Sequence, residues 1–228
     1  MIDTQTERLR AAVRWVVSPF RTVALHLLRM TAPRRFVGSI ELVDLSTSGA
    51  TEFFFTRMSE ALALLKERGP AISTGIRRRL KRIALLEAGG EFFHRGLKAY
   101  VVDLRTLKKR TVPEIALAIV HEGTHARIEH LGIRYEPTNR ERIEQLCIRA
   151  ELAFAERLPE NHGLLEVVHR KLNNQWWSEE SLHQRRLDQL KGYRVPGWVI
   201  RLYDRLFHAP QFNRRMQNHK PFPRRPRR

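Results

Sequence analysis

Residues 119–128 read IVHEGTHARI and follow directly from the apolar run TVPEIALAI of residues 111–119. This stretch decides the fold, because the apolar run has the character of a helix that enters a protein core. His121, Glu122 and His125 then fall within five positions. Burying ionisable side chains is costly unless they are paired, hydrogen-bonded or bound to a metal. The stretch therefore needs a chemical explanation.

His121 and His125 lie one helical turn apart, so their imidazole rings point the same way. That spacing lets both rings bind one zinc ion at about 2.0–2.1 Å. Glu122 lies about 100° around the helix, where it can act as a general base toward a water that the metal activates. Gly123 costs about 1 kcal/mol relative to alanine inside a helix, which indicates close approach by a neighbour or ligand. The motif predicts one Zn²⁺ per chain.

Two histidines do not complete a zinc site, so the chain should hold a third protein ligand. Glu129 stands eight residues after His121, which places it roughly 12 Å along the helix. His130 points about 140° away from His125 around the helix axis. Gly132 occupies the position at which an elongated motif would need its third histidine. The third ligand is therefore expected outside this helix.

The next predicted helix supplies two candidates, Glu144 and Glu151, two turns apart beside an apolar face. If the two helices form an antiparallel hairpin about a loop near Tyr135, Glu144 lies level with His125 and Glu151 lies somewhat beyond His121. Glu144 is the favoured ligand and Glu151 the alternative. The glutamate that does not bind the metal would orient a ligand histidine. A further alternative is that both are solvated surface carboxylates.

The motif HEGTH, with the glutamate of RIEQLCIRAELAF on the next helix, resembles the gluzincin branch of the zincins, the HExxH zinc metallopeptidases. The resemblance covers residues 97–158. It implies that His121, His125 and Glu144 bind zinc, that Glu122 is the catalytic base, and that the protein hydrolyses peptide bonds. It also implies a zincin-like α+β domain, mostly helical, with a small β-sheet and a central HExxH helix.

Local patterns divide the chain into strands and helices. Strands are expected at residues 36–45 and 97–104, and helices at 51–69, 72–90, 111–132 and 138–159, with further helical patterns over 162–207. Thr111–Glu114 and Thr138–Glu141 have the sequence of capping boxes. The strand at 97–104 precedes the motif helix. It is interpreted either as an edge strand that holds an extended peptide or as a strand that completes the sheet.

Positive charge is concentrated at the two ends of the chain. The net charge is +18, and residues 37–204 carry only +5 of it. The sequence therefore predicts a basic amphipathic N-terminal helical segment at residues 1–36, a metallopeptidase domain at 37–207 and a basic disordered tail at 208–228. The N-terminal segment either packs on the domain or lies on an anionic membrane surface.

Composition narrows the location and the partners. The single cysteine, Cys147, excludes an intramolecular disulfide framework and suits a reducing compartment. No uncharged apolar run reaches the roughly 18–20 residues of a membrane-spanning helix. A cytoplasmic protein is expected, with peripheral membrane contact as an alternative. The expected partner is a peptide or protein substrate. The alternative is a basic protein that binds nucleic acid or anionic membranes through its termini and has an inactive zincin-like core.

A peptidase also needs a donor for the oxyanion of its tetrahedral intermediate. Six side chains have suitable chemistry and the sequence does not choose among them: His94, Tyr100, Tyr135, Arg149, His162 and His169. Cys147 belongs to an apolar helical face and is expected to pack there.

Overall fold

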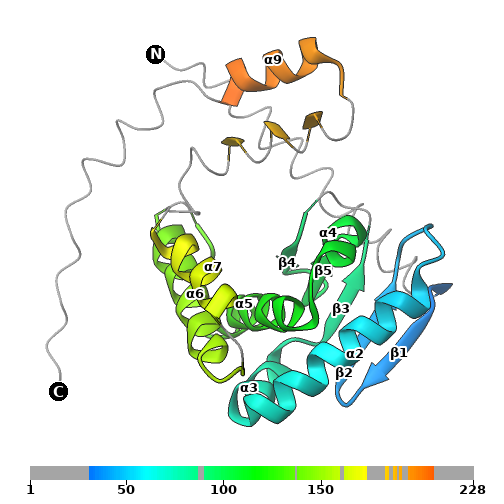
Figure 1. The fold of residues 1–228 in the computed structure, drawn as a ribbon. Helices are drawn as coiled ribbons and strands as arrows, with labels where there is room; N and C mark the ends of the chain where they lie inside the picture. Colours follow the sequence, from blue (N-terminus) through cyan, green and yellow to red (C-terminus); the bar gives the residue numbers. More distant parts are fainter. Residues whose placement is uncertain are drawn as a thin grey trace, which may run out of the picture.

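The fold combines helices with a small sheet. The structure is a computed structural model that describes residues 31–86, 90–136, 138–159, 162–173, 183–184, 187–188, 190–191 and 195–207. Over these residues the chain forms seven helices and one five-stranded sheet (Figure 1). The predicted mixture of α and β structure is confirmed at this level.

The sheet has the strand order β1-β2-β3-β5-β4. Its strands are β1 (Arg34–Val37), β2 (Ile40–Asp44), β3 (Arg82–Leu85), β4 (Phe92–His94) and β5 (Ala99–Val102). β2, β3 and β5 are parallel to one another, whereas β1 and β4 pair antiparallel at the two edges. β2, β3 and β5 form the interior of the sheet, and every residue of β2 and β5 is buried.

The prediction of one strand over residues 36–45 is wrong, because this segment contains the end of β1, a turn and the whole of β2. Phe36 pairs with Glu41, and Val37 pairs with Ile40. The chain reverses at Gly38, whose φ of 64° lies in the left-handed region that glycine enters without a steric penalty. A glycine inside an alternating pattern thus marked a turn rather than a continuous strand.

Helix α2 (Thr51–Arg68) agrees with the helix predicted at 51–69, and α3 (Pro70–Arg79) follows it after Gly69. The predicted continuation of the second helix to residue 90 is wrong, because residues 82–85 form β3. Three consecutive residues of β3 are buried between parallel neighbours. A continuous apolar run suits such a strand as well as a buried helix, so periodicity does not separate them.

The strand predicted at 97–104 is observed as β5, but its last residues belong to a short helix that the sequence did not predict. The Asp103 side chain accepts hydrogen bonds from the backbone of Arg105 and Thr106 and caps α4 (Leu104–Lys109). β5 lies between β3 and β4. The interpretation of this segment as an edge strand is therefore wrong, and the edge strand beside α5 is β4.

The motif helix is α5 (Val112–His130), and it begins as predicted. Thr111 and Glu114 form the expected capping box. Helix α6 (Arg140–Ala155) follows, but the capping box predicted at its start is not formed. The Asn139 side chain instead bonds the preceding loop, donating to Arg134 O at 2.6 Å and accepting from Glu136 N at 2.9 Å.

The remaining helices are α7 (His162–Asn173) and α9 (Gly197–Phe207), both within the region expected to be helical. Most of the predicted N-terminal segment, residues 1–30, and the predicted tail, residues 208–228, lie outside the described residues. The sheet already begins at Arg34, inside the segment predicted to precede the domain. None of the described helices combines the length and apolar character needed to cross a bilayer.

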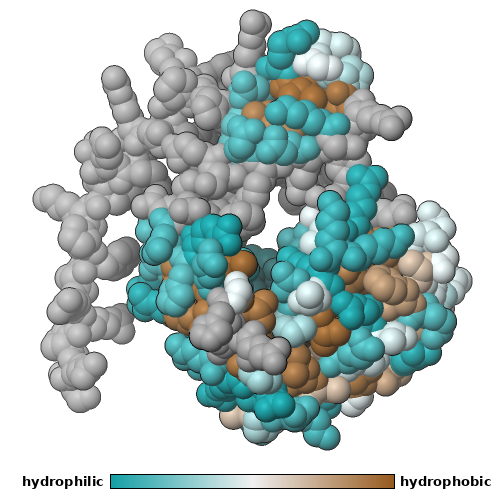
Figure 2. Space-filling view, in the orientation of Figure 1, coloured by the Kyte–Doolittle hydropathy of each residue, from teal (hydrophilic) through white to brown (hydrophobic). Residues whose placement is uncertain are grey.

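Helix α5 is central to the packing, since it contacts α2, α3 and α6 as well as β4 and β5. The space-filling view shows the surface hollowed over α5, between α6 and α7 on one side and α4 on the other (Figure 2). On the opposite side of α5, a Cβ atom on Gly123 would lie 2.7 Å from Ile76 Cγ1. The glycine in the motif is therefore explained by the close approach of α3.

Candidate metal centre

Helix α5 brings the two motif histidines together at its exposed side. The Nε2 atoms of His121 and His125 lie 3.2 Å apart, and the ring centroids are separated by 5.0 Å. The spacing follows from the four-residue separation, because side chains one turn apart project from the same side of a helix.

Helix α6 places Glu144 against both rings. One carboxylate oxygen of Glu144 lies 3.3 Å from His121 Nε2 and the other lies 3.6 Å from His125 Nε2. The Tyr135 hydroxyl donates to Glu144 Oε1 at 2.5 Å, and the Tyr135 ring contacts His125 edge-on. The expected hairpin therefore brings Glu144 to the histidine pair.

These separations fit a metal ion. For bonds of about 2.0–2.1 Å, tetrahedral geometry places neighbouring donor atoms about 3.3–3.4 Å apart. The nitrogen–nitrogen distance of 3.2 Å and the nitrogen–oxygen distances of 3.3 and 3.6 Å lie close to that value. The two Nε2 atoms therefore lie at the spacing of two ligands of one ion, and each Glu144 oxygen lies at a similar spacing from one of them.

Glu151 contacts the opposite edge of the same imidazole. Its Oε1 lies 2.6 Å from His121 Nδ1, and its Oε2 accepts from Lys171 Nζ at 2.6 Å. Glu151 is fully buried, so both carboxylate oxygens obtain in these partners the compensation that burial requires. A hydrogen bond from Nδ1 to Glu151 leaves the Nε2 lone pair of His121 free to bind a metal.

The ionisable groups are strongly coupled. Burial alone would lower the pKa of His121, but the hydrogen bonds to Glu144 and Glu151 outweigh it and raise that pKa to about 10. Burial and the charge of His121 lower the pKa of His125 to about 4. For Glu144, the hydrogen bond and charge of His121 overcome burial and lower the pKa to about 2. The cluster therefore holds one positive charge between two carboxylates, at a place where a metal cation could replace the proton.

Glu122 extends from α5 beside this cluster and is buried, with 8% of its surface exposed. Its Oε2 atom has no hydrogen-bond partner among the described residues. Burial raises the pKa of Glu122 to about 7, assisted by the charges of Glu91, Glu144 and Glu151 and opposed by that of His121. A buried carboxyl group with one free oxygen and a raised pKa has the properties of a general base or acid.

Cys147 is a donor that sequence reasoning did not consider. It lies one turn after Glu144, and its Sγ is within 4.8 Å of ligand atoms of both His121 and His125. It also packs against Ile128 and Ile143, as the sequence predicted. Burial, followed by the negative charges of nearby carboxylates, raises the pKa of its thiol well above the usual range. The Glu144 oxygens lie 3.3 and 3.6 Å from the histidine Nε2 atoms, so Glu144 and Cys147 are both candidate third donors.

A second polar group adjoins Glu122 from the sheet side. The buried Tyr100 hydroxyl donates to Glu91 at 2.9 Å, and Arg110 forms an ion pair with Glu91 at 2.6 Å. The Tyr100 hydroxyl is therefore already a donor to the Glu91 carboxylate. Glu91, Arg110 and Lys171 were missed by sequence reasoning, because each is joined to the site by contacts between segments far apart in the chain.

The other predicted oxyanion donors are distributed around the molecule. His94 Nδ1 accepts from Leu97 N within the β4–β5 turn, whereas Arg149 and His169 are exposed. The side chain of His162 lies outside the described residues. Of the six candidates, Tyr135 is the one whose contacts include the candidate metal ligands, His125 and Glu144.

Comparison with protein-family models, with curated proteins and with solved structures finds no match to this chain.

Proposed function

We propose that the protein is a zinc-dependent metallopeptidase, a hydrolase of peptide bonds. The observation that carries the proposal is the convergence of His121 Nε2, His125 Nε2 and the Glu144 carboxylate at 3.2–3.6 Å from one another. The resemblance of the HEGTH motif to gluzincins points to the same ligand set. Among the described residues, Cys147 also places a donor atom within 4.8 Å of both histidines.

His121, His125 and Glu144 would hold the ion, and Glu151 would orient His121 through Nδ1. Lys171 keeps the buried Glu151 paired, and the pKa of Glu151 is lowered against burial by the hydrogen bond to His121 and by nearby positive charge. A bound Zn²⁺ would supply Lewis acidity, which lowers the pKa of a coordinated water and polarises a carbonyl group.

Glu122 would carry the proton. Its free Oε2 takes a proton from the attacking water as the water oxygen bonds to the peptide carbonyl carbon. The same oxygen then delivers the proton to the amide nitrogen as the carbon–nitrogen bond breaks. A carboxyl group serves both steps, because its ionised form accepts a proton and its protonated form releases one.

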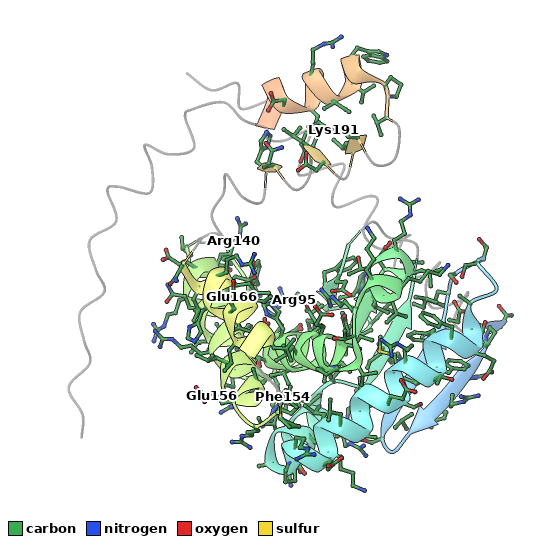
Figure 3. All side chains as sticks on the ribbon, viewed as in Figure 1. Arg95, Arg140, Phe154, Glu156, Glu166 and Lys191 are labelled. Carbon is green, nitrogen blue, oxygen red and sulfur yellow. The ribbon has the colours of Figure 1, made fainter. Side chains whose placement is uncertain are left out.

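The surroundings of the cluster support an extended substrate. β4 is an edge strand that contacts α5, and an extended peptide can add to the edge of a sheet beside such a site. Arg95, which follows β4, and Arg140, at the start of α6, both lie near the hollow over α5 (Figure 3). A chain lying across α5 would pass close to these two positions.

Two alternatives exist for the third ligand. Glu151 lies at Nδ1 of His121, away from the paired Nε2 atoms, which fits an orienting role better than metal binding. Cys147 would complete a His–His–Cys set. With Glu144 also bound, Cys147 would close the fourth position and make a structural site rather than a catalytic one. That closed site is the second candidate function.

The experiment is metal analysis combined with peptide hydrolysis. The purified protein should contain about one zinc per chain, and His125→Ala should lose both zinc and activity. Glu122→Gln should keep the zinc and lose activity by a factor of about 10² or more, the effect of removing a positioned general base. Glu141→Gln, on the exposed side of α6, is the control and should retain both. Zinc without hydrolysis in the wild-type protein would favour the structural site, and zinc loss in Glu122→Gln would contradict its role as a base.

The basic ends support a further proposal about partners. Residues 208–228 carry seven Lys/Arg and no acidic residue, so they are proposed to contact nucleic acid or anionic membranes non-specifically. The single, buried cysteine supports a cytoplasmic location with such contacts at its periphery. Deleting residues 213–228 should weaken binding to DNA and to anionic vesicles and reduce its salt dependence, without changing zinc content. Unchanged binding after the deletion would exclude this role.

A further inference from the structure

The side of α5 that faces away from the histidines borders a groove. Three helices line it, α3, α5 and α6, and its volume is about 350 Å³. Val120, Gly123, Thr124 and Arg127 form the α5 wall. Gly123 and Arg127 lie on the side of the helix opposite His121 and His125, and no candidate metal ligand lines the groove. The groove is therefore separate from the candidate metal centre.

Small side chains leave this space between the helices. Ala71 and Gly75 on α3 face Ala150 and Ala153 on α6 across the groove. Larger apolar side chains form its lining: Ile72, Ile76 and Val120. The groove is thus apolar inside and has the volume of a site for a small molecule, for which about 300 Å³ is the lower end of the usual range.

Arginine is the only ionisable residue type that lines the groove: Arg79 at the end of α3, Arg127 of α5, and Arg157 two residues after α6. None of the three forms an ion pair with a described carboxylate, although paired arginines occur elsewhere in the described structure. Arg79 donates to Gly75 O through Nη1, and its buried Nε has no partner there. Three like charges around one apolar groove repel one another, and an anion would relieve that repulsion.

We infer that this groove binds a small amphiphilic carboxylate, with the apolar part on Ile72 and Ile76 and the carboxylate at the arginines. The apolar lining and the arginines together favour a ligand that has both an apolar part and a negative charge. An uncharged apolar molecule leaves the guanidinium groups unpaired, and a small inorganic anion leaves the apolar lining unfilled. The chain's own termini are poor occupants, because residues 1–30 carry five arginines against two acidic residues and residues 208–228 carry no acid.

The test is a calorimetric titration of the full-length protein with decanoate below its micellar concentration, both with and without bound zinc. Decanoate should bind with one-to-one stoichiometry in both forms. Decanol, which has the same chain length without the charge, and acetate, which has the charge without the chain, should each bind at least about tenfold more weakly. Because the metal-free form is included, the result is independent of the proposed peptidase activity.

Variants locate the binding. Arg127→Gln and Arg157→Gln should each weaken decanoate binding by about tenfold, since each removes a charge-assisted hydrogen bond. Ala153→Trp, at an exposed helical position, should fill the groove and abolish binding. Arg78→Gln and Arg142→Gln remove exposed arginines of α3 and α6 that do not line the groove, and they should bind as the wild type does. Absence of saturable decanoate binding, equal affinity for decanol, or unchanged binding by Ala153→Trp would overturn the inference.

Discussion

The two sides of α5 are built in opposite ways. Toward α6, the helix presents His121 and His125, which lie within 3.6 Å of the Glu144 carboxylate. Toward α3, it presents Gly123, where an added Cβ would lie 2.7 Å from Ile76. One side keeps ionisable groups in a partly buried cluster, whereas the other brings two helix backbones close together through the absence of a side chain.

The difference shows what each set of residues contributes. Ionisable groups at a helix interface stabilise a fold poorly, because desolvation offsets much of their mutual attraction. Their arrangement is better explained by a ligand than by stability. Gly123 contributes no side chain where α5 meets α3, and this allows the two helices to pack closely. Substitutions on the α6 side should therefore change metal affinity, and substitutions on the α3 side should change the free energy of unfolding.

The largest expected effect is that of Glu144→Ala. The substitution removes the carboxylate that contacts both Nε2 atoms and leaves two histidines, so the site should be empty at micromolar free zinc. Competition with a chromophoric chelator measures the affinity. Glu141→Ala, one turn earlier on the exposed side of α6, should bind zinc as the wild type does.

Cys147→Ser separates the two candidate third donors. It should retain zinc if Glu144 is the ligand, because Cys147 then only packs against the site. Full zinc occupancy in Glu144→Ala together with loss in Cys147→Ser would move the assignment to the His–His–Cys set.

A smaller effect is expected for Glu151→Ala. This substitution leaves the three proposed ligands in place but removes the acceptor at His121 Nδ1, so zinc affinity or activity should fall about 10- to 100-fold. Glu151→Gln should lose less, because its amide oxygen can still accept from Nδ1. Lys171→Met removes the donor to the other oxygen of Glu151 and tests whether that contact also supports zinc binding. A loss as complete as that of Glu144→Ala would make Glu151 a ligand.

The sequence predicted the local parts of this site well. The capping box at Thr111 fixed where α5 begins, and the four-residue spacing fixed the relation between His121 and His125. The position of Glu144 followed from a hairpin with a short loop. These features depend on helix geometry over short distances, which residue type and spacing determine.

Features that depend on contacts between distant segments were not predictable in the same way. The pairing of Lys171 with Glu151 requires the direction in which α7 returns along α6. β3 was mistaken for helix because a central strand that is buried on both faces reads as a continuous apolar run, as a buried helix does. The unused capping sequence before α6 shows the same limit, since Asn139 bonds the loop instead.

Gly123→Ala is expected to change zinc affinity least of these substitutions and to lower the free energy of unfolding most clearly. The new methyl group would lie 2.7 Å from Ile76 Cγ1 and 3.1 Å from Cδ1 and Cγ2. A β-branched side chain has little χ1 freedom, so Ile76 cannot simply turn away. Overpacking of this kind costs about 1–3 kcal/mol, against which alanine gains up to about 1 kcal/mol of helix propensity. A net loss of up to about 2 kcal/mol is expected, measured by denaturant unfolding of the metal-free protein.

Gly75→Ala is the matched control, since it places the same methyl group in the middle of α3, where the new Cβ would lie 3.8 Å from Arg79 Nη1. With space available, only helix propensity acts, and the variant should be more stable than the wild type by about 0.4–1 kcal/mol. A double-mutant cycle completes the test. Ile76→Ala should destabilise the wild type but cost much less in the Gly123→Ala background, because truncating Ile76 makes room for the new methyl group. Equal costs in both backgrounds would mean that α3 does not press on Gly123, and the packing explanation for the glycine would fail.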